Sequence, residues 1–527
     1  MFKIYKKENI IIGWIKKKFK VLKMKIGLVY VKGTLPAYEN FGHLPTDIVK
    51  ENGLVEGNKA HEELDGLIIP GGSITESDSI LKNSSLAEEI IKIDKMGKPI
   101  VGICSGFQIL AKEVDIGRKS PQPIIKKGLG LLDASFSPLI SNDKVEGEVV
   151  GDSFLTKDLS KTIIGFHCHT YGKIDTGSDG LIYSTINRVN YRDEEKRVLS
   201  GIVNDDGNVI GTMIHKIFDK NEEIVENFLK FIDTNEKDKE SIFNRNKALM
   251  KKVKNEIGIE TDNNINNPLP PLKRQKNKMP LCIMIGSTGS DSGKTFITTG
   301  LAGMLKSYGL NVGLIKIGPD IRDIVPGLYL TKGIMEDFGS IKISNLGWME
   351  LENVFTQIKK SSYDIILIEG VMSVFTGMLN EKIPYSGAEI AIAGNIPMIL
   401  TTGVNKGGIE SAALDIIGHA KKLKDFGINV EGIILNKVYD MKIFENIKGY
   451  IQNETGINNI IAIPKVKMEE RGTTPEVEIK LEEFTNYAFH TINKNININS
   501  ILNIKKQCEY KGYLNFKDIL DIYKKSN

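Results

Sequence analysis

Cysteine is scarce in this chain of 527 residues, and no two cysteines form a C-x-x-C pair. The four that are present lie far apart: Cys104, Cys168, Cys282 and Cys508. A small secreted scaffold needs a dense set of disulfides, and a zinc ribbon needs cysteines paired at short spacing. Both classes are excluded, and scattered cysteines predict a protein of the reducing cytoplasm.

A strong excess of one charge and a long apolar run are also missing. The 70 Lys and Arg residues are nearly balanced by 66 Asp and Glu, so the net charge of +4 predicts no nucleic-acid partner. The apolar patch IIIGWI near the N-terminus is too short for a membrane span. Because Met24 directly precedes the first convincing strand, we interpret residues 1–23 as a basic tail that is either disordered or not translated.

The chain is long enough for two or three domains, and its pattern changes in the middle. Residues 24–233 and 280–527 alternate short apolar runs with helical patterns, which predicts two α/β domains built on doubly wound parallel sheets. Residues 234–279 are charged and then rich in Asn and Pro, which predicts a linker whose first part is helical. In the first half the predicted strands are IGLVYV, LDGLIIP, PIVGIC and VIGTMIH, and the predicted helices are SSLAEEIIKIDKMG and FQILAKEV.

The segment VGICSGFQIL places Cys104 between two glycines at a strand-to-helix turn. Small flanking residues allow the sharp turn of a nucleophile elbow, and a helix N-terminus favours the thiolate. The backbone N–H of Ser105 would face an oxyanion, with a second donor from Gly71 or Gly72 in IIPGGS. His215, after a later apolar strand, is the predicted general base. The alternative is a small buried apolar cysteine, but the three patterns together favour the nucleophile.

These segments, together with GLGLLD and GFHCH, resemble the class I glutamine amidotransferase domain of the cobyric acid synthase and cobyrinate a,c-diamide synthase family. The resemblance implies that Cys104 attacks the side-chain amide of glutamine, forms a thioester and releases ammonia, with His215 as the base. Many class I glutaminases carry a glutamate two residues after this histidine, but Ile217 stands there in this chain. The ordinary third member of the triad is therefore missing. For His167 and His169 in GFHCH we expect packing roles.

A second motif, GSTGSDSGKTFI, occupies residues 286–297 between an apolar strand and a helical pattern. Its end matches a phosphate-binding loop, but Thr288 stands where the strict pattern has glycine. Small residues let backbone N–H groups converge on phosphate, and the helix N-terminus adds a favourable dipole. Lys294 would reach the β and γ phosphates, and the Thr295 hydroxyl would bind Mg²⁺. The expected nucleotide-binding residues are Thr288, Ser290, Asp291, Ser292, Gly293, Lys294 and Thr295.

This loop resembles that of dethiobiotin synthetase and of the cobyrinate and cobyric acid synthases, where threonine occupies the place of Thr288; Ser287 departs from the glycine at the loop's start. LIKIGPDIRD, YDIILIEGVMSVFTG, GIILNKV and IPKVKMEERGTTP resemble further segments of that family. The resemblance implies ATP and Mg²⁺. It also assigns roles to residues outside the loop: Asp320 and Glu369 at the metal, Lys316 on the phosphoryl side, Asn436 at the base, and Asp323, Glu470 and Arg471 as further matches.

Several positions expected to contact the substrate depart from the family, and the domain order is reversed, so the substrate is not simply transferred. A glutaminase site and an ATP site in one chain favour glutamine-hydrolysing, ATP-dependent amidation of a small polycarboxylic acid through an acyl phosphate. The resemblance makes that acid a corrinoid or related tetrapyrrole. Two alternatives stay open: a regulatory P-loop ATPase, and a dethiobiotin-synthetase-like ligase with a vestigial glutaminase domain. A homodimer is also open. The departing positions are Ile321, Arg322, Ile324, Gly347 and Thr376.

Overall fold

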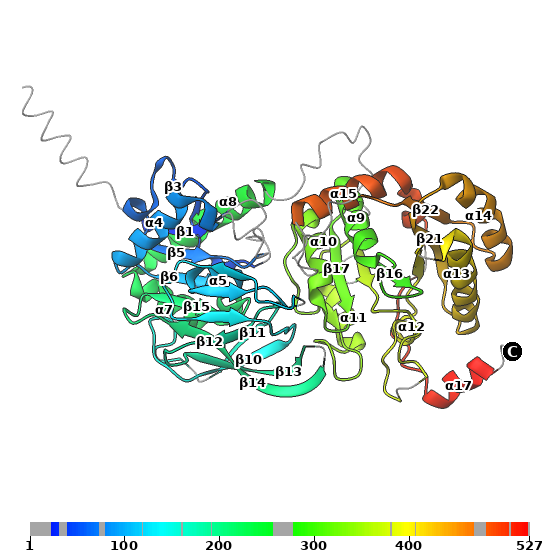
Figure 1. Cartoon of the computed structure of the whole chain (residues 1–527), viewed down its shortest axis with the longest axis horizontal. Helices are drawn as coiled ribbons and strands as arrows, with labels where there is room; N and C mark the ends of the chain where they lie inside the picture. The colour runs from blue at the N-terminus through cyan, green and yellow to red at the C-terminus, as the bar shows by residue number, and fades with distance from the viewer. Residues whose placement is uncertain are drawn as a thin grey trace, which may run out of the picture.

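The structure, a computed structural model, has two lobes side by side, one built from the first half of the chain and one from the second (Figure 1). The predicted tail, most of the Asn- and Pro-rich linker, and Glu470 and Arg471 lie outside the described residues, and the proposed domain boundaries stay predictions. The described residues are 23–30, 39–72, 80–118, 120–159, 162–190, 192–256, 278–379, 382–405, 407–467, 481–504 and 507–524.

The first lobe contains a nine-stranded sheet in the order β11-β10-β13-β14-β15-β6-β5-β1-β2. The strands from β15 to β2 are parallel and include the four strands predicted from the sequence. The other four pair antiparallel, which the sequence analysis did not anticipate. Their side chains alternate between buried and exposed, as in β10, because one face of such an extension meets solvent. The strands are β1 Ile26–Val29, β2 Asp47–Val49, β5 Gly66–Ile69, β6 Ile100–Ile103, β10 Lys144–Val149, β11 Thr162–Phe166, β13 Ile182–Val189, β14 Arg192–Val203 and β15 Val209–Thr212.

The helices of this lobe agree with the sequence in part. The predicted helix SSLAEEIIKIDKMG is α4, Ser84–Lys95, but the helix predicted from FQILAKEV ends early. Ala111 has extended backbone (φ −73°, ψ 177°), and the chain then enters a strand instead of continuing the helix. The other helices are η1 Phe41–His43, α2 Ala60–Glu63, α5 Ser105–Leu110, α6 Ile217–Lys220, α7 Glu222–Phe231 and α8 Glu236–Glu256. A small four-stranded sheet has the order β12 Lys173–Asp175, β9 Ser135–Ser137, β7 Glu113–Asp115 and β8 Ile125–Lys127. A two-stranded sheet pairs β3 Leu54–Val55 with β4 Asn58–Lys59.

The second lobe contains a seven-stranded parallel sheet in the order β18-β17-β19-β16-β20-β21-β22. Such a sheet binds ligands where the strand order reverses, at the carboxyl ends of its strands. Its strands are β16 Leu281–Ser287, β17 Val312–Ile317, β18 Ser340–Ile341, β19 Ile365–Glu369, β20 Met398–Gly403, β21 Val430–Val438 and β22 Ile460–Pro464. Its helices are α9 Lys294–Ser307, η2 Ile321–Ile324, α10 Val325–Thr331, α11 Leu351–Lys360, α12 Gly387–Ala393, α13 Gly408–Asp425, α14 Met441–Thr455, α15 Leu481–Asn495, α16 Asn499–Leu502 and α17 Phe516–Lys524.

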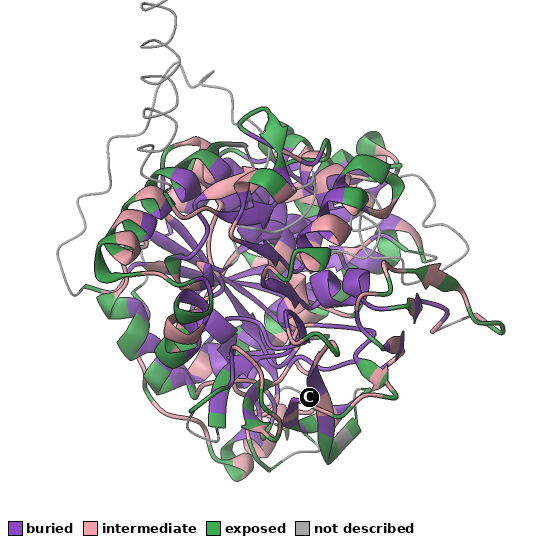
Figure 2. Ribbon diagram, turned by 90° about the vertical axis from the view of Figure 1, so that its left-hand side faces the viewer, coloured by how far each residue is buried: buried purple, intermediate pink, exposed green. Residues whose placement is uncertain are grey.

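Strand β16 shows why the strands of this sheet have continuously apolar sequences. Cys282 and Met284 belong to a core shared with α11 and α13, whereas Ile283 and Ile285 belong to a core shared with α9 and α15. Successive side chains of a strand point to opposite faces, so a sheet covered on both faces needs apolar residues at every position. In Figure 2, where the first lobe faces the viewer, buried strands likewise lie inside helices whose outer faces are exposed.

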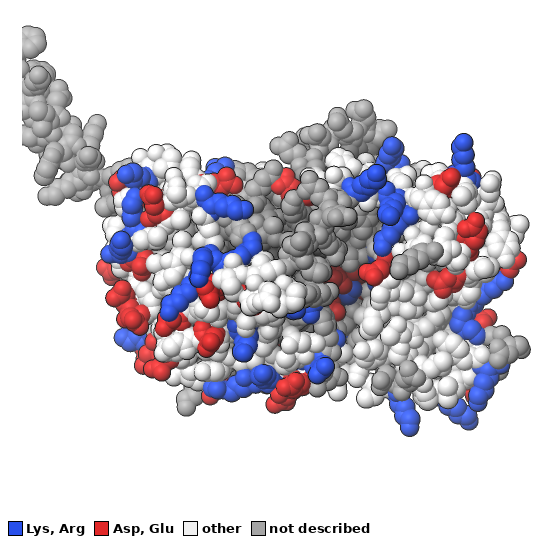
Figure 3. Space-filling model, viewed as in Figure 1, with Lys and Arg blue, Asp and Glu red and all other residues white. Residues whose placement is uncertain are grey.

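The surface agrees with the balanced composition. On the face seen in Figure 3, basic and acidic side chains are interspersed over both lobes. Among the described residues, no helix is long and apolar enough to cross a membrane.

Candidate functional site

Cys104 sits at the turn between β6 and α5 with φ 52° and ψ −109°, a conformation that an L-residue adopts only under strain. The glycines on either side make this turn feasible. A Cβ added at Gly102 would lie 2.7 Å from the Gly106 carbonyl oxygen, and one at Gly106 would lie 2.2 Å from the Ile69 carbonyl oxygen. The turn therefore has the strained geometry of a nucleophile elbow.

The IIPGGS turn and His215 lie beside this cysteine. A Cβ added at Gly71 would lie 2.7 Å from His215 Cε1 and 3.5 Å from Cys104 Cβ, so both side chains flank Gly71 closely. Cys104 Sγ also lies 3.8 Å from the carbonyl oxygen of Cys168. The structure thus brings together segments that are far apart in sequence, while the oxyanion roles of Ser105 and Gly72 stay predictions.

A carboxylate that the sequence analysis missed completes the site. Glu39 Oε1 lies 2.6 Å from His215 Nδ1, and its other oxygen accepts a hydrogen bond of 2.6 Å from the backbone N–H of Lys216. Both side chains are buried. A carboxylate on Nδ1 fixes the ring orientation and leaves Nε2 to exchange protons with the nucleophile. Glu39 therefore gives His215 a buried carboxylate partner, which Ile217 cannot provide.

The turn that presents Glu39 is held by the segment that follows His215. Asp219 in α6 accepts hydrogen bonds of 2.8 Å from the backbone N–H groups of both Asn40 and Gly42. Glu39 and His215 are 176 residues apart in sequence. No local pattern around Glu39 links it to His215, so only the fold reveals the pair.

The two histidines of GFHCH are buried next to this site. Burial lowers the pKa of His169 to about 3, and burial lowers the pKa of His167 as well, so both rings are neutral at physiological pH. His167 lies 3.3 Å from the hydroxyl groups of Ser141 and Ser200. His169 Nδ1 donates to the Leu139 carbonyl at 3.1 Å. These contacts support the packing roles expected for both residues.

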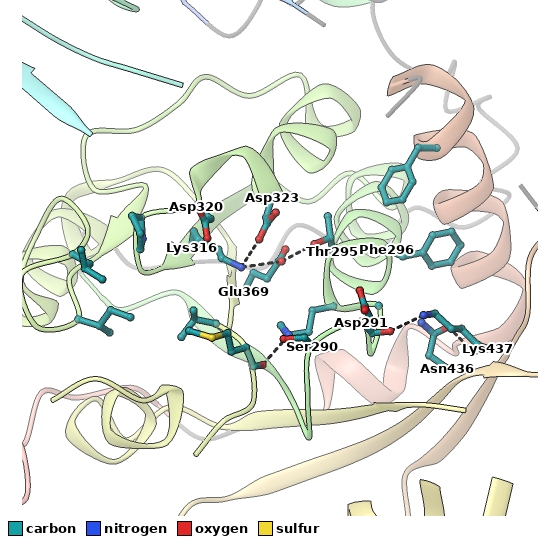
Figure 4. Close-up of a pocket in the computed structure, with 18 of the residues that line it drawn as sticks. Ser290, Asp291, Thr295, Phe296, Lys316, Asp320, Asp323, Glu369, Asn436 and Lys437 are labelled. Carbon is teal, nitrogen blue, oxygen red and sulfur yellow. Dashed lines mark hydrogen bonds and ion pairs between the residues drawn. The ribbon is translucent and has the colours of Figure 1, made fainter. Parts of the chain in front are cut away.

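The phosphate-binding motif lies in the second lobe, where it joins β16 to α9 and lines a cavity of about 680 Å³. Figure 4 shows Lys316, Asp320, Asp323 and Glu369 gathered in one part of the cavity, with Asn436 and Lys437 in another part. The residues predicted on the nucleotide side that line this cavity are Ser290, Asp291, Gly293, Lys294, Thr295, Lys316, Asp320, Glu369 and Asn436. Thr288 and Ser292 do not line the cavity but make hydrogen bonds that stabilise the loop. Thr288 Oγ1 lies 2.9 Å from Thr402 Oγ1, and Ser292 Oγ donates to the Gly289 carbonyl at 2.9 Å.

The contacts of Ser287 and Gly293 show why a serine and a glycine suit these two positions of the loop. Ser287 is fully buried, and its hydroxyl oxygen accepts a 2.8 Å hydrogen bond from Lys294 Nζ, which also donates to the Met372 carbonyl at 2.9 Å. The serine at the loop's start thus anchors the phosphate-binding lysine. Gly293 has φ 84°, and a Cβ there would lie 1.9 Å from Asn436 Nδ2, so this position requires glycine. Asn436 itself donates to the Ser292 carbonyl at 3.0 Å, and its contact with a base stays a prediction.

The charged groups of the cavity are coupled. Lys316 Nζ lies 2.7 Å from Asp323 Oδ2 and 3.1 Å from Glu369 Oε1. Burial disfavours the charge of Lys316, but Asp323 and Glu369 outweigh this effect and raise its pKa. Burial raises the pKa of Glu369 despite the attraction of Lys316. Burial, reinforced by the charge of Lys316, lowers the pKa of Lys294 to about 8.

The donor set fits Mg²⁺ bound together with phosphates. Thr295 Oγ1 donates to Glu369 Oε1 at 2.8 Å, so hydroxyl and carboxylate are adjacent. Glu369 Oε2 is buried without a hydrogen-bond partner among the described residues, and a cation would satisfy it. Asp320 lines the same cavity. The described residues hold no cluster of three acidic, His or Cys ligands.

The two lobes meet beside His215. Phe166 stacks on the His215 ring with centroids 5.2 Å apart and contacts Trp348 of the second lobe at 5.0 Å. Trp348 Nε1 donates to the Asn142 carbonyl at 3.1 Å, and Asn142 Nδ2 donates to Asp320 Oδ1 at 3.3 Å. A chain of direct contacts therefore joins His215 to the cavity of the second lobe.

Two models of known protein families match this chain, one in each lobe. Residues 26–223 match the family described as the CobB/CobQ-like glutamine amidotransferase domain. This match covers most of the first lobe. Residues 283–473 match the CobQ/CobB/MinD/ParA nucleotide-binding domain, so the amidotransferase domain precedes the nucleotide-binding domain in this chain.

Two curated relatives illustrate the similarity. The chain is 32% identical over 232 residues to the cobyrinate a,c-diamide synthase of Dehalococcoides mccartyi. This aligned region covers 42% of this chain and 48% of the relative. The chain is 36% identical over 178 residues to the cobyric acid synthase of a Thermoanaerobacter species, covering 32% of this chain and 34% of the relative. The aligned regions thus span half or less of these relatives.

Proposed function

We propose that the chain is an ATP-dependent, glutamine-hydrolysing amide synthase. Its amidotransferase domain releases ammonia from glutamine, and its nucleotide-binding domain activates a carboxylate of a small polycarboxylic acid. The acid is a corrinoid or a related tetrapyrrole, as the names of the relatives suggest. ATP and Mg²⁺ are the nucleotide and the metal.

In the amidotransferase domain, Cys104 Sγ attacks the amide carbon of glutamine after His215 takes the thiol proton. The tetrahedral oxyanion is stabilised by backbone N–H groups at Ser105 and at the Gly71–Gly72 turn. His215 then returns the proton to the leaving nitrogen, so that ammonia departs and a thioester remains. Water hydrolyses the thioester to glutamate and restores the thiol. Glu39 holds the imidazole in position through both proton transfers.

In the nucleotide-binding domain, a carboxylate oxygen of the acid attacks the γ-phosphorus of ATP and ADP leaves. Ammonia then attacks the carbonyl carbon of the acyl phosphate, which yields the amide and phosphate. Lys294 and Lys316 offset the charge that moves onto the phosphate oxygens. Mg²⁺, bound at Thr295 and Glu369 with Asp320 nearby, would add electrostatic stabilisation of the same oxygens.

The observation that carries this proposal is the junction at Phe166. This ring contacts His215 on one side and Trp348 on the other, so the ammonia-forming site lies directly against the domain that would use the ammonia. A vestigial amidotransferase domain would have no reason to retain a strained Cys104 and a buried Glu39–His215 pair. The same pair disfavours a purely regulatory ATPase.

The proposal is tested by ADP release with glutamine and a set of acids: cobyrinic acid, nickel-sirohydrochlorin and simple tricarboxylates. We expect ADP release that requires both glutamine and one tetrapyrrole acid, with formation of its amide detected by mass spectrometry. Ammonium chloride should replace glutamine. ATP turnover that depends on neither glutamine nor any acid would instead identify a regulatory ATPase.

A further inference from the structure

The nucleotide cavity is lined by a residue from the other domain. Arg188 lies at the end of β13 in the amidotransferase sheet, yet it lines the same cavity as Lys294, Thr295 and Glu369. The rest of the described lining comes from the nucleotide-binding domain. The cavity is therefore completed by a single side chain of the amidotransferase domain.

The backbone of Arg188 is fixed where the two domains meet. Its N–H and that of Asn187 donate to Asp143 Oδ2 at 3.3 and 3.1 Å. The carbonyl of Asp143 accepts a 2.7 Å hydrogen bond from His167, and the preceding residue, Asn142, contacts Asp320 across the junction. The backbone of Arg188 is thus held next to the segment that contacts Asp320.

A β-bulge bends the hairpin at this point. The β13–β14 register shifts between Ile186 and Arg188, so that two residues of β14 oppose Asn187. Bulges increase the local twist and change the direction in which nearby side chains project, and they are frequent next to active sites. At the end of β13, the bulge therefore changes the strand twist and the direction of nearby side chains relative to a regular hairpin.

The charges of the cavity indicate what Arg188 would bind. Four cations line the described cavity: three come from the nucleotide-binding domain, and the fourth is Arg188, whose charge also acts on Asp143 of its own domain. Lys294 belongs to the phosphate-binding loop, Lys316 lies between two carboxylates, and Lys437 Nζ donates to the Asp291 carbonyl at 2.6 Å. In the part near Asp320, Asp323 and Glu369, Lys316 faces three carboxylates, so an acid with several carboxylates needs an additional cation there.

We propose that Arg188 binds a carboxylate of the acid substrate, so that the acid site is built from both domains. This inference rests on the proposed function and names one residue of its substrate site. The planar guanidinium suits bidentate carboxylate binding, whereas a lysine would act only as a point charge. An acid held in this way contacts the hairpin that Asp143 ties to the His167 segment beside Cys104.

The test compares Arg188→Ala and Arg188→Lys in the full chain, with cobyrinic acid as the probe. We expect Arg188→Ala to raise the KM for cobyrinic acid roughly 10- to 100-fold, as for loss of a charged hydrogen bond, and the KM for ATP less than about threefold. Arg188→Lys should recover only part of the affinity. Calorimetric titration with cobyrinic acid, in the presence of a non-hydrolysable ATP analogue, should show the same loss without turnover.

The matched control is Arg192→Ala, because Arg192 is an exposed arginine of the same hairpin that does not line the cavity. It should leave the KM for the acid within about twofold of the wild-type value. An unchanged KM for the acid in Arg188→Ala overturns the inference, and so does a change confined to the KM for ATP, which would assign Arg188 to the phosphates. If the wild-type chain neither binds nor amidates cobyrinic acid, the proposed corrinoid substrate fails, and this inference fails with it.

Discussion

The two candidate sites differ in how the chain assembles them. The phosphate-binding loop is contiguous, since seven of its expected contacts fall within residues 288–295 on one strand–loop–helix unit. The glutaminase site takes Glu39, Gly71, Cys104 and His215 from four separate segments. A contiguous site depends on local backbone geometry, whereas a dispersed one depends on the whole sheet. The first is therefore visible in the sequence, and the second is visible only in part.

The largest losses of activity should come from substitutions that inactivate one of the two sites and leave the other working. Cys104→Ala should reduce glutamine-driven amidation by about 10⁴-fold or more, because the nucleophile is lost, and should leave ammonia-driven amidation intact. Lys294→Ala should abolish amidation with either nitrogen source and should leave glutamine hydrolysis measurable. Amide formation with glutamine and with ammonium chloride is the measurement. Equal losses with both nitrogen sources in Cys104→Ala would contradict the assignment of Cys104.

The next test addresses the dispersed character of the glutaminase site. Glu39→Gln should lower the kcat of glutamine hydrolysis roughly 10²- to 10⁴-fold, because His215 loses the carboxylate that orients it and stabilises its protonated form. The KM for glutamine and the ammonia-driven reaction should change little. Glu51→Gln, at an exposed acid nearby in sequence, is the matched control. A kcat for Glu39→Gln within about threefold of wild type would mean that the Cys–His pair acts without Glu39.

A smaller effect should appear in the pH dependence of the nucleotide site. The pKa of Lys294 is lowered to about 8, so the free protein loses this charge as the pH rises through that value. Phosphate binding favours the protonated lysine, so ATP affinity should fall by up to about tenfold per pH unit above pH 8 and stay level below it. Binding of a fluorescent ATP analogue measures this slope. Lys294→Arg, which stays charged, should flatten it, and an equal slope in both proteins would exclude Lys294 as the source.

The smallest effect should come from the junction. Trp348→Ala removes an aromatic contact with Phe166, which is worth about 0.5–1.5 kcal/mol, so glutamine hydrolysis should change about two- to tenfold through His215. Trp348 does not line the described cavity, so ATP affinity should change less. Glutaminase and ATP-binding assays on the same preparation measure both quantities. Unchanged hydrolysis would show that the contact between Phe166 and Trp348 does not influence the glutaminase site.

Much of the fold follows from local patterns in the sequence. The apolar runs of the parallel strands, the glycine-flanked Cys104 and the loop ending in Lys294 each depend on residues within a few positions of one another. The four antiparallel strands were missed, because a half-exposed hairpin carries a weaker apolar signal than a buried parallel strand. The helix after Cys104 was predicted too long, because an apolar residue at position 114 suits a strand as well as a helix.

The sequence by itself predicted two α/β units, a nucleophile, its base and a phosphate-binding loop, because each prediction depends on turn geometry and side-chain periodicity over short stretches. Only the tertiary structure decided that Glu39 meets His215, that Phe166 joins this histidine to Trp348, and that Arg188 reaches the other domain's cavity. These contacts join residues 49 or more positions apart in the sequence. They form only once the sheets are built and packed, and no local pattern encodes them.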